Sequence, residues 1–345
     1  MNRYWTLSGA PLAGLPRPEM FVAHEAPIPV PGDGQALSRT LYVSLDPYQW
    51  GYLKRAKPGD VCHARTVAQI IDSRMTEFAP GELVFNTNGW SEYALMGAGI
   101  ERPAYMIPRK LDPQRGRISL AVGVLGMLGL TAWAGMILMG KPEPGETAVI
   151  SAASGGVGQI AGQLARLRGA RVVGVAGAPE KVRYVVDELG FDACVSHRSP
   201  HFADELRDAC HAGIDLYFEN VGGAVFDAVL PEFNPGARMI ICGLIAHYGE
   251  PGDARAALMK KGERVFVERG VSVSNLFVGD FVAEHQDAFL AEMAPLVAAG
   301  KIKYREDIGH GFETIPSLFA GMMRGENFGK TLVQLAEDPT AKHEV

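Results

Sequence analysis

The sequence predicts an α/β fold in which a doubly wound parallel sheet follows a β-rich, barrel-like region. Two observations predict the sheet: a strand-like run leads into a glycine turn at residues 151–158 and then a helical pattern, and short apolar strands alternate with helices from residue 121 onward. A third observation, short β-branched runs among many Pro and Gly residues before residue 117, predicts the all-β region.

The first part of the chain carries three expected strands. Residues 36–43 follow a turn at Gly32-Asp33-Gly34, and residues 67–71 and 82–85 are parted by Pro80-Gly81. Because these runs are short and bounded by turn residues, they are typical of a small barrel-like domain. We expect this domain to span residues 1–120.

The middle of the chain alternates between strands and helices. The helical run 159–167 leads after Gly169 to the strand 171–176, which closes a βαβ unit. We expect a dinucleotide-binding domain over residues 121–305 and a tail, 306–345, that returns to the first domain with a helix at 313–323 and a strand at 329–335. The six strands expected in the parallel sheet are residues 148–150, 171–176, 193–195, 214–219, 237–241 and 271–277.

The glycine turn is the candidate anion site. A strand, a turn with few side chains and a helix N-terminus let a pyrophosphate approach free backbone N–H groups and the positive end of the helix dipole. The expected contacts are Ser154, Gly155, Gly156, Val157 and Gly158, although Ala153 stands where the usual fingerprint has its first glycine. The alternative is a tight packing turn that binds nothing.

The next turn indicates which dinucleotide is bound. Sites for NAD place an acidic residue about 20 residues after the glycines, on the ribose hydroxyls. Gly177 occupies that position, and Lys181 follows shortly after. Because an ammonium suits a 2′-phosphate and a carboxylate repels it, the sequence favours NADP. The alternative for Lys181 is a solvated residue on the first turn of the next helix.

Composition excludes several classes of function. With 345 residues, 47% of them hydrophobic, the chain can bury a large core, and a net charge of −6 without a basic block argues against nucleic-acid binding. The N-terminus lacks an apolar signal segment and the four cysteines are widely spaced, so we expect a cytoplasmic protein with reduced thiols. Residues 118–140 carry no charge, but their five glycines favour a buried helix and turn over a membrane span.

No metal site is expected. A zinc site needs Cys, His or acidic ligands that converge on one ion, and a structural site needs clustered cysteines. Cys62-His63 is an adjacent Cys–His pair, and the cysteines are not clustered. We therefore interpret His63 as a packed or surface residue; the alternative is a zinc ligand.

Blocks of sequence along nearly the whole chain resemble the medium-chain dehydrogenase/reductase superfamily. Within it the chain is similar to the zinc-free, NADPH-dependent double-bond reductases, which include leukotriene hydroxydehydrogenases, prostaglandin reductases and bacterial curcumin reductases. The resemblance implies a GroES-like substrate domain, a Rossmann domain that binds NADPH, and a homodimer. The blocks that carry it are Ser44-Leu45-Asp46-Pro47-Tyr48, residues 126–132, the glycine turn, Glu219-Asn220-Val221-Gly222-Gly223, Cys242-Gly243-Leu244, residues 300–304 and residues 326–330.

The resemblance also implies roles for single residues. Tyr248 corresponds to the family's hydroxyl donor, after a sheet strand where ligands bind in this fold, and Tyr48 matches a second candidate. Either tyrosine alternatively is an interface residue with an incidental hydrogen bond. The remaining expected cofactor contacts are Met127, Thr131, Gly177, Lys181, His197, Asn220, Cys242, Gly243, Tyr248, Leu276, Phe277 and Asn327.

The chemistry that follows is hydride transfer to the β-carbon of an α,β-unsaturated aldehyde or ketone. Negative charge then develops on the carbonyl oxygen, and without a metal an O–H donor must stabilise it. The family usually continues Asp-Pro-Tyr with Met-Arg, but Gln49-Trp50 stand here, so the substrate pocket is expected to differ. Two alternatives stay open: a quinone reductase of the same superfamily, and an inactive NADPH-binding redox sensor.

Overall fold

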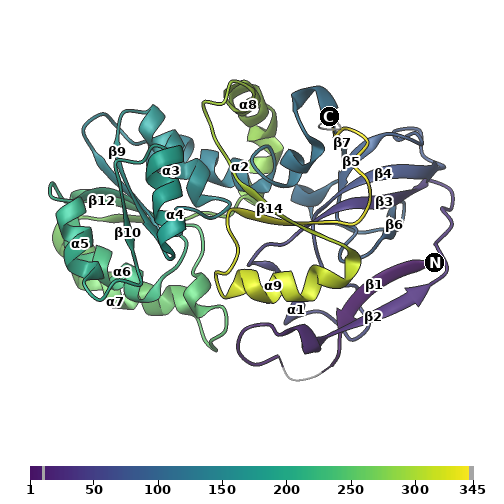
Figure 1. The fold of residues 1–345 in the computed structure, drawn as a ribbon, viewed down its shortest axis with the longest axis horizontal. Helices are drawn as coiled ribbons and strands as arrows, with labels where there is room; N and C mark the ends of the chain where they lie inside the picture. The colour runs from purple at the N-terminus through teal and green to yellow at the C-terminus, as the bar shows by residue number, and fades with distance from the viewer. Residues whose placement is uncertain (10–11, 342–345) are drawn as a thin grey trace. The chain divides into compact units, whose positions relative to one another are not determined.

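The computed structural model describes residues 1–9 and 12–341. They form two compact units, one made of residues 1–126 with the C-terminal segment from 306, and one made of residues 127–305 (Figure 1). The sequence predicted a first boundary after residue 120, and the compact units separate after Gly126.

The unit of residues 127–305 is built on one six-stranded sheet. All five neighbouring pairs of strands are parallel, which confirms the predicted doubly wound sheet. In spatial order the strands are β10 (Ala193–Ser196), β9 (Arg171–Ala176), β8 (Thr147–Ile150), β11 (Ile214–Glu219), β12 (Phe233–Ile241) and β13 (Ser272–Asn275). The order reverses direction between β8 and β11, and ligands of open α/β sheets bind beside such a point, outside the carboxyl ends of the strands.

Helices cover both faces of this sheet because its strands are apolar throughout; β8, for example, is fully buried. On one face, residues of α5 (Phe202–Ala209), α6 (Gly223–Val229) and α7 (Ala254–Arg269) join the strands in a single hydrophobic core. Figure 1 shows these three helices grouped together. On the other face, α3 (Gly158–Leu167) packs against β8 and β9, and α2 (Met127–Trp133) packs against α3 and α8 (Gly279–Ala298).

The uncharged stretch 118–140 is not one helix. It consists of a 3₁₀ turn (Ile118–Val122), α2 and a π-helical segment (Ala134–Gly140), and most of its residues are buried. Close packing explains two of its glycines, because a Cβ at Gly135 or Gly140 would lie within 3.2 Å of Phe218 or Leu216 on β11. Among the described residues, no helix combines the length and hydropathy that a membrane crossing requires.

The other unit is predominantly antiparallel β-structure, as the sequence predicted. Its main sheet has the order β14 (Glu306–His310), β15 (Lys330–Gln334), β3 (Gln35–Ser44), β4 (Thr66–Ser73), β5 (Leu83–Asn86) and β7 (Arg109–Lys110), with β6 (Tyr93–Gly97) also paired to β3. The hairpin-like pair β1 (Asn2–Leu7) and β2 (Phe21–Ala26) was not predicted. Helices α1 (Gln49–Leu53) and α9 (Ile315–Met323) complete it; the predicted helix at 313–323 begins with a 3₁₀ turn.

Candidate active site

Most of the sequence-predicted cofactor residues lie just beyond the carboxyl ends of the six parallel strands. The glycine turn follows β8, Gly177 and Lys181 follow β9, and His197 follows β10. Asn220 follows β11, Cys242 and Gly243 follow β12, and Leu276 and Phe277 follow β13. Because parallel strands end at the same edge of their sheet, the fold gathers these residues along one edge.

Two glycines of the glycine turn have little room for a side chain. A Cβ added at Gly158, the first residue of α3, would lie 2.3 Å from the carbonyl oxygen of Ala152, and one at Gly155 would lie 3.1 Å from it. Ala152 itself has a φ of 49°, in the left-handed region that non-glycine residues seldom adopt. The turn therefore keeps its backbone bare where α3 begins, which is the geometry that anion-binding turns require.

Hydrogen bonds join β8 and β11 across the point where the strand order reverses. The Asn220 backbone N–H donates to Ser151 Oγ at 2.7 Å, and Asn220 Nδ2 donates to the Ser151 carbonyl oxygen at 2.7 Å. The Ser151 hydroxyl in turn donates to Glu219 Oε1 at 2.9 Å. Glu219 is fully buried, and burial raises the pKa of its carboxyl. Ser151 and Glu219, which sequence reasoning did not single out, thus hold Asn220 beside the glycine turn.

Basic side chains gather after β9 and β10. A Cβ at Gly177 would lie 3.0 Å from His197 Nε2 and 3.2 Å from Arg198 Nε, so both side chains crowd the position where NAD sites carry an acid. Burial lowers the pKa of His197, and the nearby charges of Arg198 and Lys181 lower it further. Sequence reasoning did not select Arg198, because its proximity to Gly177 depends on the pairing of β9 with β10.

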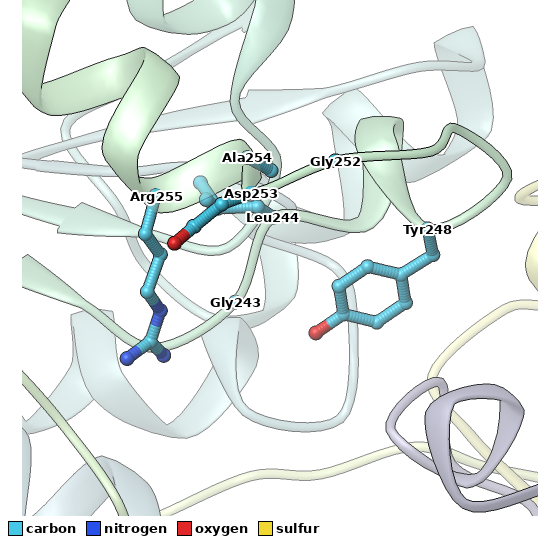
Figure 2. Close-up of a pocket in the computed structure, with 7 residues that line it drawn as sticks. All are labelled: Gly243, Leu244, Tyr248, Gly252, Asp253, Ala254 and Arg255. Atoms are coloured by element: carbon cyan, nitrogen blue, oxygen red, sulfur yellow. The ribbon is translucent and has the colours of Figure 1, made fainter. Parts of the chain in front are cut away.

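Tyr248 lies on the loop between β12 and α7. A Cβ at Gly243 would come within 3.3 Å of the Tyr248 Oη, which places the hydroxyl beside the end of β12. Burial raises the pKa of Tyr248, so the phenol keeps its proton at neutral pH. Figure 2 shows the Tyr248 ring directed toward Gly243 (Figure 2). Burial also raises the pKa of the Cys242 thiol, to about 12, so this thiol is protonated and uncharged at neutral pH.

Met127 and Thr131 lie on α2 of the same unit. Thr131 is buried and donates through Oγ1 to the Met127 carbonyl oxygen at 2.6 Å, one turn earlier on α2. Leu276 is buried, whereas Phe277 is 50% exposed. Both residues follow the carboxyl end of β13, which ends at Asn275.

The two remaining predicted residues, Tyr48 and Asn327, belong to the other unit. Tyr48 Oη lies 3.3 Å from His63 Nε2, and His63 stacks on Tyr52 with a ring separation of 4.8 Å. Burial lowers the pKa of His63 to about 4, and the charges of Arg65 and Arg102 contribute, so the imidazole is neutral at pH 7. Asn327 donates through Nδ2 to the Gly329 carbonyl oxygen at 2.9 Å.

Gln49 and Trp50, which depart from the family pattern, are core residues of α1. Both are fully buried. Gln49 Nε2 donates to the Ser44 carbonyl oxygen at 2.7 Å, and Trp50 Nε1 donates to the Gly14 carbonyl oxygen at 3.0 Å. The departure is therefore accommodated by packing and backbone hydrogen bonds around Tyr48, without an unsatisfied group on either side chain.

The described residues contain no group of three His, Cys, Asp or Glu side chains able to hold a metal ion. His63 contacts the ring of Tyr52 and the hydroxyl of Tyr48. All four cysteines are free thiols.

Comparison with known proteins identifies the family. Residues 156–294 match a family described as zinc-binding dehydrogenase, and residues 3–101 match the N-terminal domain of oxidoreductases. The chain is 38% identical to an NADPH-dependent curcumin reductase of Escherichia coli, over 98% of both chains. The chain belongs to the medium-chain dehydrogenase/reductase superfamily, in the branch of NADPH-dependent double-bond reductases.

Further relatives and solved structures are similar to this chain. Prostaglandin reductase 1 of Rattus norvegicus is 34% identical over 96% of this chain and 98% of its own. The crystal structure of CurA from Vibrio vulnificus in complex with NADPH superposes with a TM-score of 0.87, at 38% identity over 97% of this chain and 99% of the other. A quinone oxidoreductase of Escherichia coli at 15% identity, with a TM-score of 0.75, shares the fold.

Proposed function

We propose that this protein is an NADPH-dependent reductase that transfers a hydride to the β-carbon of an α,β-unsaturated aldehyde or ketone. The single observation that carries the proposal is the placement of the Tyr248 hydroxyl beside Gly243, at the same sheet edge as the glycine turn and Asn220. A neutral O–H donor at the edge where a dinucleotide binds is what this reaction requires.

The residues present fit NADPH. The bare turn before α3 suits the pyrophosphate, and Asn220, held by Ser151, suits the adjoining ribose. His197 and Arg198 lie beside Gly177, and the charge of Lys181 acts on His197, so this turn offers the positive charge and hydrogen-bond donors that a 2′-phosphate requires. The bound nicotinamide supplies the hydride from its C4 atom. Met127, Thr131, Cys242, Leu276 and Phe277 are proposed to border it, and Asn327 stays a cofactor contact proposed on the family resemblance.

The protein's own contribution is to stabilise charge on the acceptor. Hydride addition to the β-carbon breaks the C=C π bond, and the electron pair moves to the carbonyl oxygen as an enolate. The Tyr248 hydroxyl donates a hydrogen bond to that oxygen. A proton then adds to the α-carbon, so that one hydride and one proton saturate the bond. Tyr48 is the second candidate donor, and its raised pKa, caused chiefly by burial, likewise keeps it protonated.

Isotope transfer tests the proposal directly. Wild-type protein is incubated with NADPH deuterated at C4 and benzylideneacetone, and the product is examined by NMR. We expect deuterium on the β-carbon and a solvent-derived hydrogen on the α-carbon. Deuterium on the carbonyl carbon would show alcohol dehydrogenase chemistry instead. Oxidation of NADPH by benzoquinones but not by enones would favour the quinone reductase, and NADPH binding without oxidation by any acceptor would favour the redox sensor.

We also propose a homodimer, which the family resemblance implies, and a cytoplasmic location, which the widely spaced cysteines favour. Light scattering behind gel filtration measures the mass of the assembly, and a mass of twice 37.1 kDa is the expected result.

A further inference from the structure

A small pocket lies beside Tyr248 and is formed by the loop from β12 to the start of α7. Its volume is about 320 Å³, within the range of pockets that hold small ligands. Its residues are Gly243, Leu244, Tyr248, Gly252, Asp253, Ala254 and Arg255. Of these side chains, the Tyr248 hydroxyl and the Arg255 guanidinium are the hydrogen-bond donors, and Figure 2 shows both.

Arg255 is a cation without a partner among the residues that the structure describes. Its side chain is exposed, and it makes no hydrogen bond or ion pair with any residue that the structure describes. The nearby acids have other partners: Asp253 Oδ1 accepts from the Ala256 N–H at 3.0 Å and caps α7, and Glu250 Oε2 lies 2.7 Å from His247 Nδ1. A guanidinium carries five N–H donors in a planar fork that matches a carboxylate, and here that fork is not used by the fold.

The Arg255 charge also reaches the proposed reaction centre. Burial raises the pKa values of Tyr248 and Cys242, and the Arg255 charge opposes both increases. Tyr248 and Arg255 line the same pocket, so one small molecule bound there can contact both side chains. Asp253 weakens the positive potential of the pocket, but the N-terminus of the 16-residue helix α7 partly offsets its charge.

We propose that Arg255 determines substrate specificity by binding a carboxylate on the acceptor, so that the preferred substrates are enones or enals with an acidic group. This inference rests on the proposed function, because it places the carbonyl oxygen of the same molecule at Tyr248. The Arg255 guanidinium stays hydrated when a neutral acceptor binds, whereas an acidic acceptor forms a charge-assisted, bidentate pair with it. Discrimination therefore arises at Arg255, and Tyr248 acts on the carbonyl in both cases.

The experiment compares para-carboxybenzylideneacetone with its methyl ester, which carries the same enone. Wild type is expected to have a kcat/KM at least about tenfold higher for the acid, as one charge-assisted hydrogen bond provides. Arg255→Gln should remove this preference and leave the ester within twofold of wild type, and Arg255→Lys should keep part of it. Arg264→Gln on the same helix, whose guanidinium already pairs with Glu268 at 2.8 Å, is the matched control and should behave as wild type.

Two results would overturn the inference: equal kcat/KM of wild type for acid and ester, or equal losses for both substrates in Arg255→Gln. A binding measurement separates this failure from failure of the proposed function. The saturated analogues of acid and ester are titrated calorimetrically into wild type and Arg255→Gln with NADP⁺ present. Arg255-dependent binding of the acid without turnover of either enone would refute the enone reductase and retain the carboxylate site. Acid binding that does not depend on Arg255 would refute the site.

Discussion

Removing the positive charge of Lys181 should convert an NADPH-preferring protein into one that distinguishes the two cofactors poorly. Lys181 lies on α4 (Pro179–Arg183), near enough to His197 for its charge to lower the pKa of that imidazole. A hydrogen bond from a charged donor contributes about 1.5–3 kcal/mol, which is roughly a 10- to 150-fold change in Kd. We therefore expect Lys181→Ala to weaken NADPH binding by that factor and to leave NADH within about twofold.

Fluorescence titration of the bound nicotinamide measures both Kd values at fixed ionic strength, since salt screens such contacts. Arg183→Ala is the matched control: it removes the same charge from the same short helix, but residues two apart do not share a helix face. Arg198→Ala should reproduce the Lys181→Ala effect, because its guanidinium lies beside Gly177. Equal wild-type affinity for the two cofactors, or an equal loss for both in Lys181→Ala, would refute the reasoning.

Four other outcomes are expected. Tyr248→Phe should lower turnover about 10²–10³-fold with NADPH affinity nearly unchanged; turnover within twofold of wild type would move the role to Tyr48. Gly158→Ala should lower the free energy of unfolding by about 1–3 kcal/mol and weaken NADPH binding, because the new Cβ meets the Ala152 carbonyl oxygen. Denaturant titration measures the free energy of unfolding, and ligand titration measures NADPH binding. His63 has a folded pKa of about 4, below its unfolded value, so its contribution to stability is complete above pH 6.5 and is lost as the pH falls toward 4. The free energy of unfolding should fall by up to about 1.4 kcal/mol per pH unit in this range. Urea unfolding should show a steeper pH dependence for wild type than for His63→Gln. Activity should survive chelators, and loss of activity that added zinc restores would contradict this.

The sequence was sufficient for the parallel sheet because its signals are local. Each strand is a short apolar run between turn residues, and a bare turn between a strand and a helix has few other uses. The sequence predicted the ends of strands less accurately. β12 begins at Phe233, four residues before the predicted start, although Pro235 and Gly236 lie within it. Proline and glycine usually end strands, and here the irregular pairing of β11 with β12 accommodates them.

The contacts around the site could not be predicted, because they depend on which strands are neighbours. Ser151 and Glu219 are 68 residues apart and meet only because β8 pairs with β11. Arg198 reaches Gly177 only because β10 pairs with β9. Arg255 appears in the sequence as one of many basic residues on a polar helix, and its position in the Tyr248 pocket follows from the path of the loop before α7. Family motifs identify residues at strand ends but not their supporting partners.

The surroundings of the two tyrosines give a physical reason to place Tyr248 before Tyr48 as the hydroxyl donor. Tyr48 Oη lies 3.3 Å from a neutral imidazole, so its proton points to His63 whenever Nε2 is the unprotonated nitrogen. Only the tautomer with a protonated Nε2 leaves the Tyr48 O–H for an acceptor. At Tyr248, a hydrogen bond from the Leu244 backbone opposes the increase in pKa that burial causes, and a backbone N–H donor leaves the phenol proton for an acceptor. Tyr248 can therefore donate its O–H to an enolate directly, whereas donation by Tyr48 requires one particular tautomer of His63.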